Sequence, residues 1–329
     1  MKHLTNEDYN GGCKPQKEDG RDFVLGDIVY TPDPNCPTFE QGFDVKSRTG
    51  VFKREHQGSS SSCVGQAWSK YLEILHIIEA KDKQYENFNV DLSARDIYSQ
   101  IALPGGGAYT RDGAEVAVKK GNCQENLLPS YENGANPTEP FMKSRDGISP
   151  LAETDALFYR ALKYVRIDTA PVLRDVDWED IRQVIWQFNG FVSGYRRHCM
   201  YAGGFGLVEG KRAIKFINSY GSGSDRWYVE GNENELYNIT FLYNLYNLPT
   251  DMKLEKIPIN KELLDFLYKY GLHRKPDPKA QSWIGHNLQT FGNKVMGTKD
   301  SPEEKGAPEW KLYNLAAKIL QVFKINKLI

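Results

Sequence analysis

The feature that most constrains the fold is a change of hydrophobic period partway along the chain. After Cys63, apolar residues recur at intervals of three and four over about four turns, which is typical of an amphipathic helix. From Gly190 onward the sequence breaks into short strand-like runs separated by glycine-rich turns: GFVSGY, CMYAGGFGLVEG, RAIKFINSYG and RWYVEG. Helices therefore come first and an antiparallel sheet follows. This order indicates an α+β fold with two unlike halves.

Three further segments between these two regions carry helical signals. DLSARDIYSQIAL is predicted to be a helix with Ser93 as its N-cap, because a serine hydroxyl accepts from the free N–H groups of a first turn. TRDGAEVAVKKGNC is predicted to be a helix that Gly121 closes. DWEDIRQVIWQF begins with a capping acid and places its apolar residues on one side.

The 329 residues fit one large domain with extensions, or two domains. Residues 1–35 are polar and rich in Gly, Pro and Asp, which indicates an extension draped on the core. Residues 36–249 hold the helix and strand patterns of the main domain. Residues 250–329 turn helical again in NKELLDFLYKY and EWKLYNLAAKILQVFKI. They are predicted to form a helical C-terminal extension that docks on the main domain or on a partner.

Composition excludes several classes of protein. Lys and Arg number 42 against 43 Asp and Glu, and this balance argues against a nucleic-acid-binding protein. The sequence has no run of 18 apolar residues and no secretory signal, so we expect no membrane partner and a reducing, cytoplasmic location, or association with a virion if the source is a phage. None of the five cysteines forms a CxxC pair, so a structural zinc site is not expected. The reaction that the sequence suggests below implies no metal or organic cofactor.

The stretch EHQGSSSSCVGQAWSKYLEIL carries the chemical signal. A helix that begins at Cys63 places the thiol at the positive end of the helix dipole, where the thiolate is favoured. Ser61 or Ser62 is the expected N-cap. The backbone N–H of Cys63 and the side-chain amide of Gln57 could both donate to an oxyanion, so the pattern predicts a cysteine nucleophile with two stabilising donors.

Such a nucleophile needs a base, and His198 is the best placed of the six histidines. It opens the β-rich half, whereas the others lie in the extensions, beside Gln57 or far along the first helix. A hairpin that joins His198 to the NSYG turn would bring Asn218 beside it. The asparagine oxygen could then accept from the imidazole and orient it.

In this order and spacing, QGSSSSC, His198 and NSYG resemble the papain-like cysteine peptidases. The resemblance covers roughly residues 36–245 and includes LSARDIYSQ as the helix after the active-site helix. It implies a papain-like α+β fold and hydrolysis of peptide bonds in a peptide or protein substrate. It assigns Cys63 as nucleophile, His198 as base, Asn218 as the orienting residue and Gln57 as the oxyanion-hole donor. It also assigns Gly105, Gly106 and Gly107 to the backbone of the substrate.

Several positions depart from the family pattern. Val64 and Tyr220 stand where the family often has tryptophan, and Arg197 precedes the histidine where Asp or Asn is common. An inward-pointing Arg197 would lower the pKa of His198. Ser60 replaces the usual disulfide cysteine, which suggests a bacterial or phage-type member without the usual bridges.

These departures leave two alternatives to a peptidase. The first is a catalytically silent relative that binds peptides or serves as a structural component. The second is another acyl transfer by the same residues, such as transglutamination or amidase chemistry on cell-wall peptides.

Overall fold

The structure is a computed structural model that describes residues 11–15, 24–25, 31–50, 52–53, 55–82, 90–131, 134, 136–167, 177–232 and 236–245. All of these residues belong to one unit, Met1–Tyr246. A second unit, Asn247–Ile329, lies outside the described residues, and so do the predicted helices of the C-terminal extension.

The helices of the described residues begin and end as follows: α1 Lys46–Thr49, α2 Cys63–Asp82, α3 Ala94–Ile101, α4 Thr110–Lys119, α5 Glu139–Lys143, α6 Pro150–Ala156 and α7 Trp178–Gln187. The strands are β1 Cys13–Lys14, β2 Phe43–Asp44, β3 Ala108–Tyr109, β4 Ala161–Arg166, β5 Phe191–Tyr195, β6 His198–Val208, β7 Lys211–Ile217, β8 Arg226–Val229 and β9 Leu236–Leu245. Helices thus dominate the first half and strands the second, which confirms the predicted α+β class.

Local signals set the helix ends as predicted. The Ser93 side chain accepts from the backbone N–H of Asp96 at 3.0 Å and caps α3. Asp177 does the same for α7 through the N–H of Glu179 at 2.9 Å. Gly121 follows α4 with a φ of 82°, a left-handed conformation that glycine adopts without strain.

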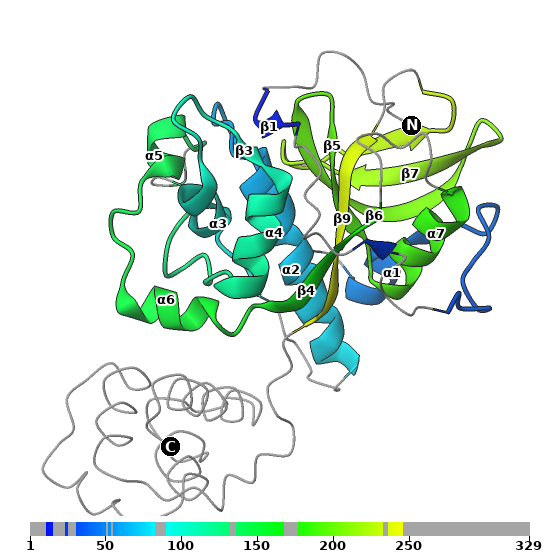
Figure 1. The fold of residues 1–329 in the computed structure, drawn as a ribbon, viewed down its shortest axis with the longest axis horizontal. Helices are drawn as coiled ribbons and strands as arrows, with labels where there is room; N and C mark the ends of the chain where they lie inside the picture. Colours follow the sequence, from blue (N-terminus) through cyan, green and yellow to red (C-terminus); the bar gives the residue numbers. More distant parts are fainter. Residues whose placement is uncertain are drawn as a thin grey trace, which may run out of the picture. The chain divides into compact units, whose positions relative to one another are not determined.

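The seven-stranded sheet has the order β4-β9-β5-β6-β7-β8, with β2 paired to β6, and every pairing in it is antiparallel. β6 and β7 form a hairpin in which Tyr201 lies opposite Ile217. A separate small sheet joins β1 to β3 in parallel, with Cys13 opposite Ala108. This small sheet brings the N-terminal part of the chain between the helices and the large sheet (Figure 1).

Helix α2 lies between α3 and α4 on one side and the large sheet on the other (Figure 1). Trp68 and Tyr71 are fully buried, and the Tyr71 hydroxyl donates to the carbonyl of Gly190 at 2.6 Å, where the chain enters β5. Even Lys70 and Glu73 are buried. The expected helix with one apolar face is therefore a central helix that is buried almost all round, because helices cover one side and strands the other. Among the described residues, no helix has the length and apolar character needed to cross a membrane.

Candidate active site

Cys63 is the first residue of α2 and is fully buried. The preceding serines form a bonded turn. The Ser60 hydroxyl lies 2.6 Å from the Gln57 carbonyl oxygen and 2.7 Å from the Ser62 hydroxyl. The carbonyl of Ser62 accepts the first helical bond, from the N–H of Gln66 at 3.0 Å, so Ser62 holds the N-cap position. The serine run is thus an ordered entry to α2 that sets where the thiol lies.

Gln57 joins this turn to the sheet half. Its backbone N–H donates to the carbonyl of Ser219 at 2.8 Å. Its side-chain oxygen accepts from the Ser219 hydroxyl at 2.5 Å, and its Nε2 donates to the carbonyl of Ser60 at 2.9 Å. The amide is fully buried and held at both ends. Sequence reasoning missed Ser219, whose only signal is its place after Asn218.

His198 and Asn218 lie side by side, as the hairpin predicted. Nε2 of His198 is 2.8 Å from Oδ1 of Asn218. The same oxygen accepts from the N–H of Ser219 at 2.8 Å, which fixes the amide orientation and makes Nε2 of His198 the donor. The Tyr220 ring stacks on the imidazole with centroids 5.4 Å apart. Tyr220 therefore stacks on the imidazole at the position where the peptidases that the sequence resembles often have tryptophan.

The two halves meet at the sulfur of Cys63. Near this sulfur, the backbone N–H groups of Cys199, the residue after His198, and of Val64 act to lower the pKa of the thiol. Burial nevertheless raises the pKa of the Cys63 thiol, and the neighbouring Cys13 adds to the increase. The expected preference for the thiolate is therefore wrong for the described form, because burial outweighs the helix N-terminus.

The residues that bury this thiol come from the N-terminal segment, residues 11–15. A Cβ on Gly12 would lie 2.8 Å from Sγ of Cys63 and 2.3 Å from the carbonyl oxygen of Ser61. The carbonyl of Gly12 accepts from the N–H of Ala108 at 2.8 Å, and the N–H of Cys13 donates to the carbonyl of Arg197 at 2.8 Å. The N-terminal segment thus lies over Cys63 and bonds to both halves. Sequence reasoning placed this segment on the core without a site, although a Gly-Gly pair is a signal for close backbone approach.

The three glycines predicted to bind substrate backbone differ in their surroundings. A Cβ on Gly107 would lie 2.4 Å from the carbonyl oxygen of Gly12, so this glycine faces the N-terminal segment directly. Gly106 lies close to Glu139. Gly105 is exposed, and a Cβ there would meet nothing within 4 Å. The structure therefore places Gly107 at the site and Gly105 at its outside.

Glu139 and Tyr98 join the glycine stretch to the serine turn, and sequence reasoning missed both. Glu139 in α5 accepts from the N–H of Ser61 at 2.6 Å and from the Tyr98 hydroxyl at 2.7 Å. That hydroxyl in turn accepts from the N–H of Gly107 at 2.8 Å. Arg197, by contrast, is exposed with its guanidinium beside Gly11, so it points along the N-terminal segment.

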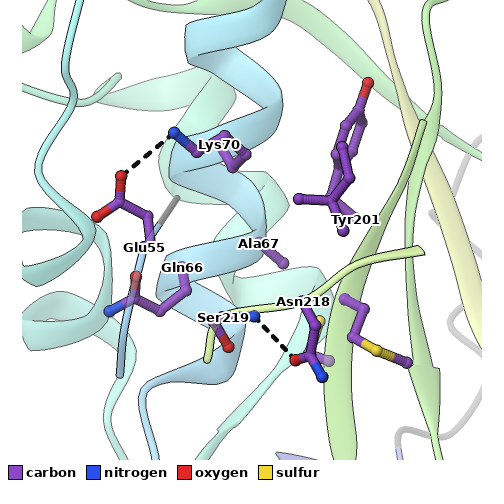
Figure 2. A pocket seen from close by; sticks show the side chains of 10 residues that line it. Glu55, Gln66, Ala67, Lys70, Tyr201, Asn218 and Ser219 are labelled. Atoms are coloured by element: carbon purple, nitrogen blue, oxygen red, sulfur yellow. Dashed lines mark hydrogen bonds and ion pairs between the residues drawn. The ribbon is translucent and has the colours of Figure 1, made fainter. Parts of the chain in front are cut away.

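A small cavity lies behind the site, and the residues that line it are Glu55, Gln66, Ala67, Lys70, Cys199, Met200, Tyr201, Ile217, Asn218 and Ser219 (Figure 2). Lys70 reaches Glu55 at 3.2 Å and Glu73 at 2.5 Å. Oxygens of Glu55, Glu73 and Asp91 lie within 4.8 Å of one another, a spacing that could hold a cation. The ammonium group of Lys70 already supplies positive charge to two of these carboxylates.

The fold of the described residues, with a helix that starts at a cysteine and a hairpin that pairs histidine with asparagine, is the papain-like α+β fold. The structural neighbours are papain-like cysteine proteases. Xylellain, a cysteine protease from Xylella fastidiosa, is 21% identical, with 71% of this chain and 96% of that chain covered and a TM-score of 0.53. At this identity the likeness establishes the fold, which confirms the resemblance seen in the sequence.

Two other neighbours have lower scores, and the fold assignment rests on xylellain. Procathepsin B from Trypanosoma congolense is 12% identical over 66% of this chain and 81% of that chain, with a TM-score of 0.48. Bromelain from Ananas comosus is 15% identical over 62% of this chain and 99% of that chain, with a TM-score of 0.44. No protein-family model matches the sequence, and no curated protein matches it. All five cysteines are free, in agreement with the predicted lack of bridges.

Proposed function

We propose that the chain is a cysteine peptidase that hydrolyses peptide bonds with Cys63 as nucleophile. His198 takes the thiol proton, and the sulfur of Cys63 attacks the carbonyl carbon of the substrate. Nε2 of Gln57 and the backbone N–H of Cys63 donate to the oxyanion. His198 then protonates the leaving amine, which gives a thioester, and activates water to hydrolyse it. The products are an acid and an amine, and the thiol is restored.

The observation that carries this proposal is the ordered contact between His198 and Asn218 next to the nucleophile. The contact is 2.8 Å long and buried, and the N–H of the following residue, Cys199, acts to lower the pKa of the Cys63 thiol. An imidazole that donates to an amide oxygen through Nε2 is held in one orientation. Because Nε2 carries the proton in the neutral ring, Nδ1 carries none. Nδ1 can therefore exchange a proton with a nearby thiol.

The described form is closed, so a substrate must displace the N-terminal segment. The backbone of this segment already bonds to Ala108 and to Arg197, groups that lie on either side of Cys63. We propose that an extended substrate backbone uses the same two groups once the N-terminal segment leaves. Removing the cover also exposes the thiol to water, which lowers the pKa of Cys63 toward the range in which a thiolate forms.

Substitution of Cys63 tests the proposal. We expect Cys63→Ala to lower the rate of peptide hydrolysis by about 10⁶-fold, because no nucleophile remains. A thiol-reactive peptide epoxide should label Cys63 stoichiometrically in the native chain. Cys36→Ala is the matched control, since Cys36 is a free buried cysteine that contacts Arg182 and Pro37 instead of the site.

Two results would favour a silent peptide-binding relative instead. One is hydrolysis that survives Cys63→Ala, and the other is epoxide labelling of Cys63 no faster than of Cys36. The buried, neutral thiol under the N-terminal segment is the observation that supports this second candidate. A chain that labels at Cys63 but releases transamidated peptides or cleaves only cell-wall amides would be an acyl transferase or amidase, and analysis of the products would show it.

Replacing Asn218 by alanine is expected to lower kcat about ten- to hundredfold and to leave KM nearly unchanged. The reason is that a hydrogen bond to a charged imidazolium contributes about 1.5–3 kcal/mol. Steady-state kinetics on one peptide substrate measures both constants. Asn126→Ala is a control on an exposed turn asparagine outside the site. A rise in KM with unchanged kcat would mean that Asn218 binds substrate and does not orient His198.

Activity is also expected to follow a bell-shaped pH profile, because the active form needs a thiolate and an imidazolium together. The acid limb reports the loss of the thiolate, and the alkaline limb reports the loss of the imidazolium. A profile that stays flat between about pH 5 and 8 would contradict this ion pair.

A further inference from the structure

Three cysteines from distant parts of the chain gather at the site. Cys13 comes from the N-terminal segment, Cys63 from the start of α2, and Cys199 from β6; none is more than 1% exposed. Sγ of Cys13 lies 3.4 Å from the hydroxyl of Thr110. The Cys199 side chain lowers the pKa of Cys13, and Thr110 acts to lower the pKa of both thiols, so the three side chains influence one another. The proposed mechanism uses Cys63 and leaves the other two thiols without a role.

The backbone holds Cys13 against Cys199 from two sides. The N–H of Cys13 donates to the carbonyl of Arg197 at 2.8 Å, two residues before Cys199. On the other side Cys13 lies opposite Ala108 in the small parallel sheet. Because Cys199 is an interior residue of β6 and pairs with Gly194 in β5, its own position is set by the large sheet. The fold therefore holds the backbone of Cys13 beside the start of β6, which carries Cys199.

We propose that Cys13 and Cys199 are a redox-active thiol pair, which a low-molecular-weight disulfide converts into an intramolecular disulfide that fastens the N-terminal segment over Cys63. One thiolate of the pair attacks a sulfur of the small disulfide and displaces a first small thiolate. The second protein thiolate attacks the resulting mixed disulfide and displaces the other. Two protein thiols are oxidised, one small disulfide is reduced to two thiols, and a reductant reverses the exchange.

The contacts favour Cys13 with Cys199 over Cys13 with Cys63. The N–H of Cys13 bonds the carbonyl of Arg197, two residues before Cys199, and the Cys13 sulfur contacts Thr110, whereas the residue that lies against the Cys63 sulfur is Gly12. The Cys199 side chain lowers the pKa of Cys13, which supports Cys13 as the attacking thiol. Both thiols are buried, so the reaction needs the N-terminal segment to lift. Strand β1 is only two residues long, and its parting exposes both thiols together.

The first test is chemical and does not depend on the proposed peptidase function. The full chain carrying Cys63→Ala is incubated with oxidised glutathione, treated with N-ethylmaleimide, digested without reduction and mapped by mass spectrometry. We expect a cross-linked peptide pair joining Cys13 to Cys199 as the main disulfide product. Adding Cys13→Ser should abolish it, and the same exchange in urea should scatter disulfides over Cys13, Cys36, Cys123 and Cys199.

Two outcomes of this mapping would overturn the proposal. In one, Cys13 and Cys199 remain separate, each carrying glutathione or maleimide. In the other, Cys13 joins Cys36 or Cys123 as readily as Cys199 in the folded chain. In the chain that keeps Cys63, a dominant disulfide between Cys13 and Cys63 would also overturn it.

The second test asks whether the disulfide fastens the N-terminal segment over Cys63. The expected effect on alkylation does not depend on the proposed function, whereas an effect of the disulfide on peptide hydrolysis rests on it. After oxidation, alkylation of Cys63 by iodoacetamide should slow by about tenfold or more, and dithiothreitol should restore it. In Cys199→Ser, oxidation should leave the alkylation rate unchanged. A mapped disulfide with unchanged alkylation would refute the fastening. Slowed alkylation in a chain that never hydrolyses peptides would support the fastening and refute the peptidase proposal, so the two failures are distinct.

Discussion

Replacing Gly12 by valine is expected to raise the rate at which iodoacetamide alkylates Cys63 by about ten- to hundredfold. A Cβ at this position would lie 2.3 Å from the carbonyl oxygen of Ser61 and 2.8 Å from the Cys63 sulfur, distances that atoms cannot hold. One of the clashing atoms belongs to the backbone of Ser61, which cannot turn aside as a flexible side chain can. The N-terminal segment is therefore the part that has to move. Overpacking of this kind costs about 1–3 kcal/mol, which shifts the equilibrium toward a form with the segment displaced.

The pH dependence of the same alkylation provides a second readout. Burial raises the pKa of Cys63 in the closed form, so the native chain should react appreciably only at alkaline pH. Once Gly12→Val exposes the sulfur, the midpoint of the alkylation rate should move to lower pH. If the proposed function is correct, peptide hydrolysis should rise as well.

Gly206→Ala is the matched control for this substitution. A Cβ there would meet the Trp227 ring at 3.6 Å, an ordinary contact, so its alkylation rate should equal that of the native chain. Circular dichroism would show that both variants are folded. An unchanged rate in folded Gly12→Val would mean that the N-terminal segment does not protect Cys63 in solution.

Replacing Lys70 by methionine is expected to lower the free energy of unfolding by about 3–5 kcal/mol. Lys70 is 4% exposed and bonds Glu55 and Glu73 at 3.2 and 2.5 Å. Burial raises the pKa of Glu73 to about 7, even with this cation beside it. At Glu55, burial acts to raise the pKa, but Lys70 and Lys53 outweigh it and hold the pKa below its ordinary value. Removing the ammonium group leaves two buried carboxyl groups without their shared partner.

Urea denaturation measures this loss, and an exposed ion pair provides the control. Lys119 bonds Glu115 at 2.6 Å, but its side chain is 68% exposed, so Lys119→Met should change stability by at most about 1 kcal/mol. The double variant Lys70→Met with Glu73→Leu should recover part of the loss, because it removes one unpaired carboxyl group as well. Equal effects of Lys70→Met and Lys119→Met would show that the buried ion pairs do not stabilise the fold.

The sequence predicted those parts of the fold that short-range chemistry controls. Ser93 and Asp177 cap their helices and Gly121 follows the end of another, because a cap or a left-handed turn depends on a few neighbouring residues. The contact between His198 and Asn218 was also predictable. A hairpin brings residues on either side of its turn together, whatever packs around it.

The sequence predicted which residues form the candidate site, but it did not predict the protonation state of the Cys63 thiol. Cys63, His198, Asn218 and Gln57 follow from their order along the chain, and their catalytic roles stay predictions. The helix dipole indicated a thiolate at Cys63, whereas burial under the N-terminal segment raises the pKa of that thiol. No local signal reports which distant segment covers a side chain, so the balance between these two effects could not be read from the sequence.

The sequence by itself determined the four longer helices, α2, α3, α4 and α7, the caps of α3 and α7, and the hairpin of β6 and β7. Only the tertiary structure decided that α2 is buried almost all round, that Lys70 is buried with Glu55 and Glu73, and that Gly12 lies over Cys63. The physical reason is that periodicity and capping act within a few residues, while burial depends on segments far apart in the chain. A short segment without a period, such as residues 11–15, is positioned entirely by the backbone groups it meets on the folded surface.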